Sequence, residues 1–235
     1  MKAPRWLLIT SLILNLVGGC YLLFGLYKSA EQNSELSRAK EGQYFYMQRD
    51  ALFALLPKDS NEIVFTGDSH IEYFNATEFY KNCLIKNRGI ESDVTGGVLY
   101  RLIEVVKSKP VKIFIEAGTN DVMRGYTQDT IMYNFKYMMD YIKYESPASK
   151  IYVMSIVPNA GFVRRSNDAT MPITLELNRR LITLCQQEYV QYIDFTSLLL
   201  KEDHIIEKYY IYDLQHLSPK GYVLLKNVLQ KYVNE

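Results

Sequence analysis

Short apolar runs alternate with longer amphipathic ones from Asn61 to the end of the chain. The short runs are rich in Ile, Val, Phe and Tyr, a composition that predicts β-strands. The run Ile113-Phe114-Ile115 has no polar interruption, as expected of a strand buried on both faces of a sheet. The predicted strands are Glu62–Thr66, Leu84–Asn87, Val111–Ala117, Lys150–Val157 and Val190–Asp194.

Between these strands, apolar residues recur at the three- and four-residue spacing of amphipathic helices. The predicted helices are Phe74–Cys83, Val98–Lys107, Asp129–Tyr144 and Leu175–Glu188, with a last helix that begins near Pro219. Alternating strands and helices predict one α/β domain over residues 59–235, with a parallel sheet between layers of helices. Reactive side chains in such sheets gather beyond the carboxyl ends of the strands.

The amino terminus carries a run that is long enough to cross a bilayer. Trp6–Tyr27 contains no charged residue, and Lys2 and Arg5 precede it. This charge pattern predicts that residues 1–28 are a signal anchor, with the rest of the chain outside the cytoplasm. Two alternatives stay open. Leu16–Cys20 resembles a lipoprotein box, which would lipidate Cys20, and a cleaved signal peptide would also export the domain.

Residues 29–58 connect this run to the α/β domain. The polar stretch Ser29–Glu41 predicts a tether. The apolar residues that follow have helical spacing and predict a helix packed onto the domain and ended by Pro57.

Composition and charge narrow the choice of partners. The chain has 235 residues and a formal net charge of +1, and no basic run suggests a nucleic-acid partner. Cys20, Cys83 and Cys185 have no metal-ligand spacing. Cys83 and Cys185 could pair, but buried free thiols are the favoured interpretation.

Chemistry-bearing residues follow the predicted strands. Ser69 comes directly after the first strand, where the following helix would hold its hydroxyl in an exposed position. Asp213 and His216 stand three residues apart, just before the last helix, so the carboxylate could orient the imidazole. A helix cap and a surface loop are the plain alternatives for these two segments.

Two further strand ends could supply hydrogen-bond donors to a negatively charged oxygen. Gly89 follows the second strand and Asn120 the third. The N–H groups of Ser69 and Gly89 and the side-chain amide of Asn120 are therefore predicted to form an oxyanion hole.

These four segments resemble the motif blocks of the SGNH (GDSL-like) hydrolase family. The match falls, in family order, on Gly67-Asp68-Ser69, Gly89, Gly118-Thr119-Asn120-Asp121 and Asp213-Leu214-Gln215-His216. It extends from about Tyr44 to Tyr232, and Lys86–Ile90 is similar to the subgroup that resembles platelet-activating-factor acetylhydrolase. The resemblance implies a flavodoxin-like three-layer fold with a five-stranded sheet and ester or thioester hydrolysis without a metal or other cofactor. His70 departs from the family, where an apolar residue is commoner, and is expected to alter the pocket wall.

The function that follows from these observations is removal of a small acyl group, acetyl in the first place, from an exported glycan. Ser69, His216 and Asp213 would act as the triad, and Arg88, Arg164 and Arg165 would contact the alcohol portion. A solvated loop is the plain alternative for the stretch that carries Arg164 and Arg165. The twenty tyrosines, which offer apolar faces for sugars, support a carbohydrate substrate. A lysophospholipase or thioesterase is the alternative enzyme, and a non-catalytic glycan-binding or assembly protein is the alternative outside enzymes.

Overall fold

The computed structural model describes the backbone of residues 5–161, 170–202 and 204–235. It contains two compact units, Met1–Arg49 and Asp50–Glu235. Helix α1 (Arg5–Leu55) accounts for the described part of the first unit and continues through Ser29–Glu41. The structure differs there from a separate tether, because this stretch lacks Gly and Pro and is rich in residues that favour helix.

In the part of the chain whose side chains are described, no helix is long and apolar enough to span a bilayer. The expected span Trp6–Tyr27 falls mostly outside that part, which begins at Gly19. The membrane helix is therefore not supported by the structure and stays a prediction.

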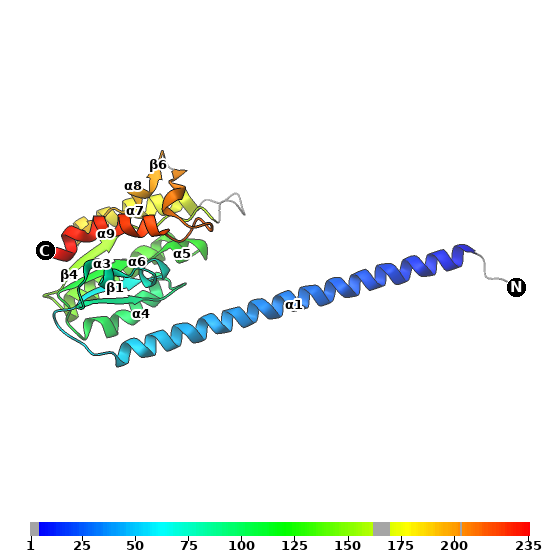
Figure 1. Ribbon diagram of the computed structural model, residues 1–235, viewed down its shortest axis with the longest axis horizontal. Coiled ribbons are helices and arrows are strands. Elements are labelled where there is room, and N and C mark those ends of the chain that lie inside the picture. The colour runs from blue at the N-terminus through cyan, green and yellow to red at the C-terminus, as the bar shows by residue number, and fades with distance from the viewer. Residues whose placement is uncertain (1–4, 162–169, 203) are drawn as a thin grey trace. The chain divides into compact units, whose positions relative to one another are not determined.

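The second unit contains the predicted parallel sheet (Figure 1). Its strands have the order β2-β1-β3-β4-β5, which is the flavodoxin-like order. All neighbouring pairs in this sheet are parallel. The strands are β1 (Ile63–Gly67), β2 (Ile85–Gly89), β3 (Lys112–Glu116), β4 (Lys150–Met154) and β5 (Gln191–Ile193). Each coincides with a predicted strand to within a few residues.

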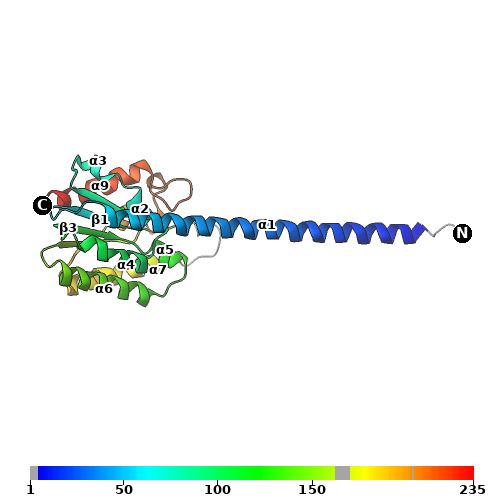
Figure 2. The same cartoon turned by 90° about the horizontal axis from the view of Figure 1, so that it is seen from below.

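Helices cover both faces of the sheet, as the alternating pattern predicts (Figure 2). One face packs against α4 (Thr95–Val106), α6 (Gln128–Glu145) and α7 (Thr170–Gln187), through Ile113, Ile115 and Val153 of the sheet. The other face packs against α2 (Ser69–Glu72), α3 (Ala76–Tyr80) and α9 (Pro219–Asn234). On that face the rings of Phe65, Phe114 and Tyr152 stack from strand to strand, at centroid separations of 4.4 and 4.5 Å.

Several short elements have no counterpart in the sequence prediction. They are α5 (Thr119–Met123), α8 (Thr196–Leu199), the hairpin of β6 (Leu200–Lys201) and β7 (His204–Ile205), and the 3₁₀ turn η1 (Glu207–Tyr209). Runs of two to five residues are too short to show a periodic pattern.

The three cysteines are free in the structure. Cys185 is buried, as expected, whereas Cys83 and Cys20 are exposed. The expectation of a buried thiol is therefore wrong for Cys83, which lies just before β2 at the surface.

The strand order changes direction at β1. β1 lies between β2 and β3; α2 and α3, which connect β1 to β2, cover one face, whereas α4, which connects β2 to β3, covers the other. In such sheets the crevice beyond the carboxyl ends of the strands at this reversal is where ligands bind. Ser69 follows β1 and Asn120 follows β3, so the fold brings both to the carboxyl ends of these strands.

Candidate active site

Ser69 lies at the junction of β1 and α2. β1 ends at Gly67, and Asp68 caps α2 by accepting a hydrogen bond from the His70 N–H at 3.0 Å. Ser69 is the first residue of α2, with 2% of its surface exposed. This turn requires glycine at position 67, because a Cβ there would lie 2.0 Å from the carbonyl oxygen of Glu116.

Ser69, His216 and Asp213 form one hydrogen-bonded chain. The Oγ of Ser69 lies 3.1 Å from Nε2 of His216, and Nδ1 of His216 lies 2.6 Å from Oδ2 of Asp213. Ser69 and His216 are 147 positions apart in the sequence. Folding therefore brings together the nucleophile, base and carboxylate that the motifs single out.

The carboxylate of Asp213 decides which tautomer His216 adopts. Because Oδ2 can only accept, Nδ1 carries the proton and Nε2 is left to accept the proton of the Ser69 hydroxyl. Partial burial opposes ionisation of Asp213, but bonds from the His216 ring and from two backbone N–H groups lower its pKa below the usual value. His216 can thus take the proton of the Ser69 hydroxyl as this attacks, and the Asp213 carboxylate can stabilise the imidazolium that forms.

The loop that carries Asp213 and His216 is fastened at several points. Oδ1 of Asp213 accepts the N–H groups of Gln215 and His216, at 2.9 and 3.0 Å. Leu214, between them, has a left-handed φ of 56°, and its carbonyl accepts the N–H of Ala160 at 3.0 Å. α9 begins immediately afterwards at Pro219, with Ser218 as its cap. The imidazole is therefore presented by a rigid turn.

Both predicted oxyanion donors besides Ser69 already have acceptors. The N–H of Gly89 donates to Oδ1 of Asn87 at 2.8 Å. The amide of Asn120 donates to the carbonyl of Asp93 at 2.9 Å and lies 3.4 Å from Oδ2 of Asp68. Either group would have to share its proton with a bound oxyanion, so the oxyanion hole stays a prediction.

Comparison with known proteins gives the family. A model of the GDSL-like lipase/acylhydrolase family matches residues 73–224, more than half of the chain. The chain belongs to this family. The assignment makes the protein a hydrolase of carboxylic esters and confirms the resemblance seen in the sequence. The match begins after Ser69, so the place of that residue in the site rests on the geometry above.

Three similar proteins illustrate the relationship. A candidate platelet activating factor from Streptococcus pneumonia has 25% identity and a TM-score of 0.74, over 87% of this chain and 98% of that one. A candidate acylhydrolase from Bacteroides fragilis NCTC 9343 has 26% identity and a TM-score of 0.70, over 80% and 95%. N-Acylneuraminate cytidylyltransferase of Escherichia coli O18:K1:H7 is 29% identical over 180 residues. That match covers 74% of this chain but only 40% of the relative.

The predicted substrate residues of this GDSL-like protein are not all brought to the triad. The guanidinium of Arg88 lies over the ring of Phe53, 5.1 Å from its centroid, and lines a small cavity with Glu62 and Arg101. No triad residue lines that cavity. Arg164 and Arg165 lie outside the described residues.

Other buried polar residues of the site were missed by the sequence analysis. Arg101 donates to Asp93 at 2.6 and 2.9 Å and to the carbonyls of Gly67 and Arg88 at 3.1 and 2.7 Å. Burial raises the pKa of Asp93 to about 6, although Arg101 opposes this shift. The sequence feature that could have indicated this pair is the position of Arg101 on the apolar stripe of α4. An ionisable residue there is rarely buried without a partner.

A second buried group lies beside the nucleophile. Among the described residues, Asp68, His70 and Glu116 are the only His, Cys or acidic side chains whose atoms are close enough together to enclose a metal ion. All three are buried. We expected His70 to alter the pocket wall, but its side chain is buried beside Asp68 and Glu116. His204, in contrast, is exposed as predicted.

We expect Gly89→Ala to destabilise this GDSL-like domain and to displace α2. A Cβ at position 89 would lie 2.3 Å from the backbone nitrogen of Glu72. Relieving that overlap requires a backbone shift, which costs about 1–3 kcal/mol. The melting temperature measured by circular dichroism should fall.

Gly96→Ala provides the matched control. The nearest atom to a Cβ there is Nδ2 of Asn134 at 3.7 Å, an ordinary contact, and position 96 lies in α4, where alanine favours helix. Equal melting temperatures for the two variants would contradict the close approach of β2 and α2.

Proposed function

We propose that this protein is a serine esterase that removes small acyl groups, acetyl in the first place, from a carbohydrate. The observation that carries the proposal is the hydrogen-bonded chain Ser69–His216–Asp213 at the carboxyl edge of the sheet. Ser69 attacks the ester carbonyl, and His216 accepts the hydroxyl proton and then donates it to the departing alcohol. Water, activated by the same imidazole, then releases the acyl group from Ser69.

The surroundings of Ser69 support a short acyl chain. An acyl tunnel beneath α2 would have to pass through Asp68, His70 and Glu116, all with 2% or less of their surface exposed. Charged and polar groups in that position are a poor wall for a long aliphatic chain. The connections after β1 and β3 are also short, since α2 and α5 begin within three residues of the strand ends.

An aromatic side chain beside the triad supports a carbohydrate as the alcohol portion. The ring of Tyr73 lies 5.6 Å from that of His216, and 42% of the Tyr73 surface is exposed. Tyrosine combines an apolar face with a hydroxyl group, which suits the mixed surface of a sugar. The E. coli relative is named for a reaction on an N-acylneuraminate, an acylated sugar acid, which adds support from outside the chain.

We expect Tyr73→Ala to weaken binding of an acetylated glycan and to leave hydrolysis of nitrophenyl acetate nearly unchanged. The variant should raise KM for the glycan about 10-fold, the scale of one lost stacking contact. Wild-type protein should prefer acetyl over decanoyl esters of nitrophenol. Steady-state kinetics on the three substrates would measure both effects.

Two controls accompany Tyr73→Ala. Tyr73→Phe keeps the ring and should keep most of the glycan affinity. Tyr144→Ala removes a more exposed tyrosine, 83% against 42%, from the carboxyl end of α6 and should change nothing. A strong preference for the decanoyl ester would favour the lysophospholipase or thioesterase alternative instead.

Export of the domain also stays a proposal. It is supported by the uncharged run Trp6–Tyr27 after Lys2 and Arg5. Mass spectrometry of the amino terminus of the mature protein would separate an intact anchor from a lipidated Cys20 or a cleaved signal peptide.

A further inference from the structure

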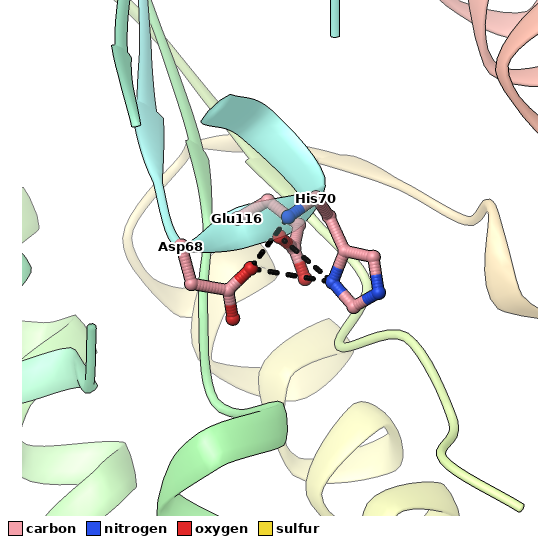
Figure 3. A group of neighbouring side chains, drawn as sticks. All are labelled: Asp68, His70 and Glu116. Atoms are coloured by element: carbon pink, nitrogen blue, oxygen red, sulfur yellow. Dashed lines mark hydrogen bonds and ion pairs between the residues drawn. The ribbon is translucent and has the colours of Figure 1, made fainter. Parts of the chain in front are cut away.

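His70, the residue after Ser69, lies in a buried group with Asp68 and Glu116 (Figure 3). Its Nδ1 atom lies 3.2 Å from Oδ1 of Asp68 and 3.6 Å from Oε2 of Glu116. The three side chains come from the end of β1, the first turn of α2 and the end of β3, and none has more than 2% of its surface exposed. Among the described residues, no other histidine lies in such a group.

The other ring nitrogen of His70 faces the triad loop. Nε2 lies 3.0 Å from the carbonyl oxygen of Gln215. A carbonyl oxygen can only accept, so Nε2 carries a proton. The carboxylate oxygens on the opposite side are acceptors as well. A neutral imidazole has only one N–H. With that N–H on Nε2, Nδ1 would turn its lone pair toward the carboxylate oxygens of Asp68 and Glu116. The approach of Nδ1 to Asp68 and Glu116 is an ion-pair contact without hydrogen-bond geometry, and it favours a proton on Nδ1 as well as on Nε2.

Gln215 links this ring to the acid/base pair. It stands between Asp213 and His216, and its own N–H donates to Oδ1 of Asp213 at 2.9 Å. The His70 ring thus contacts the carbonyl oxygen of Gln215, and the N–H groups of Gln215 and His216 donate to the Asp213 carboxylate. Since His70 also follows Ser69 in the chain, one ring fastens the nucleophile's helix to the loop that carries its base. The His70 and His216 rings are 6.1 Å apart.

We propose that His70 is a positioning residue that, as an imidazolium, sets the distance between His216 and Ser69 through the carbonyl of Gln215. The proposal rests on the proposed triad. It also assigns the cation of the buried group, which is the imidazolium itself and not a metal ion. His70 is too deeply buried to touch a substrate, so it acts only through the loop.

The surrounding charges agree with this assignment. Burial works against a charged His70, but Glu116 and Asp68 more than offset it and hold the pKa of His70 well above its usual value. Burial and the charge of Asp68 raise the pKa of Glu116, which His70 partly opposes. Tyr222 of α9 also faces the two carboxylates, and burial raises its pKa, which keeps the phenol neutral.

This arrangement has a defined effect of pH on stability. A histidine whose folded pKa lies above its unfolded value of about 6.5 stabilises the fold fully below that pH. The contribution is then lost as pH rises through the folded pKa. Wild-type stability should therefore decline on the alkaline side, and a variant without the imidazole should lack that decline.

Two substitutions separate the two ring nitrogens. His70→Asn places an amide near the Nδ1 position and removes the bond to Gln215, whereas His70→Gln places its amide near Nε2 and can keep that bond. We expect kcat to fall about 10²-fold in His70→Asn, the cost of a misplacement of about 1 Å, with KM nearly unchanged. His70→Gln should retain more than a tenth of the wild-type kcat. His204→Asn removes an exposed imidazole, whose Nδ1 lies 2.7 Å from the carbonyl oxygen of Glu202, and should leave kcat unchanged.

A measurement on the wild-type protein keeps the test independent of activity. Long-range ¹H–¹⁵N spectra at pH 8, assigned with His70→Asn, should show both His70 nitrogens protonated. One unprotonated nitrogen would overturn the proposal, and so would one equivalent of tightly bound metal found by elemental analysis. Equal kcat values for His70→Asn and wild type would also overturn it. If instead Ser69→Ala stays active, the proposed triad fails while the spectrum still reports the state of His70.

Discussion

Ser69→Ala should lower kcat for ester hydrolysis by about 10⁴- to 10⁶-fold, the range seen when a serine nucleophile is removed from an intact triad. The reason is that Ser69 alone in the hydrogen-bonded chain can form the acyl-enzyme, with His216 3.1 Å from its hydroxyl. The loss should appear equally in kcat and in kcat/KM, since the alanine keeps the space for substrate. Steady-state kinetics and labelling with a serine-reactive phosphonate would measure it.

The fold should survive this substitution. Ser69 donates one hydrogen bond to a neutral imidazole, so its loss changes stability by about 1 kcal/mol. Ser197→Ala is the matched control, because Ser197 also lies in the first turn of a short helix that follows a strand of the same sheet, but it is exposed. Phosphonate labelling at any residue other than Ser69, with activity retained in Ser69→Ala, would falsify the assignment of the nucleophile.

Asp213→Asn should lower kcat by about 10⁴-fold, as happens when a triad carboxylate is replaced by its amide. The asparagine amide would donate to Nδ1 of His216, which moves the ring proton to Nε2 and turns an N–H toward the Ser69 hydroxyl. Its remaining oxygen can still accept the N–H groups of Gln215 and His216, so the turn itself should persist. The substitution therefore tests the imidazole contact at 2.6 Å and little else.

Asp194→Asn controls for the loss of an acidic cap. Asp194 follows β5 and its Oδ1 accepts the N–H of Ser197 at 3.0 Å, a local bond like those made by Asp213, but no imidazole faces it. Its kcat should equal that of the wild type. A kcat for Asp213→Asn within threefold of wild type, with the turn intact by spectroscopy, would show that Asp213 does not orient His216.

Periodicity predicted the central architecture because the sheet is the part of the fold in which side-chain pattern and burial coincide. Ile113, Phe114 and Ile115 are all fully buried, as an uninterrupted apolar run requires. α2 and α5 could not be found in this way. Each is at most five residues long, and each depends on a strand end and a backbone turn rather than on an apolar stripe.

The same division holds within the site. The types and order of Ser69, Asp213 and His216 predicted acyl transfer. Ser69 follows the first strand, and Asp213 and His216 come just before the last helix. The position of Arg88 along the second strand did not show where its guanidinium lies, since alternate residues of a strand point to opposite faces; the guanidinium lies over Phe53. The place of Glu116 and Arg101 near the site was not predicted. The sequence shows them only as charged residues within apolar runs.

By itself, the sequence determined that this chain folds as strands and helices in alternation and that it carries the residue types of a serine esterase at strand ends. Both follow from short-range chemistry, namely the spacing of apolar residues and the turns that glycine permits. Only the tertiary structure decided which atoms meet across 147 residues, and that His70 turns inward between two carboxylates and the carbonyl of Gln215. Such contacts depend on the order of the strands and on how α2 and the triad loop close over the sheet, and no local pattern encodes those distances.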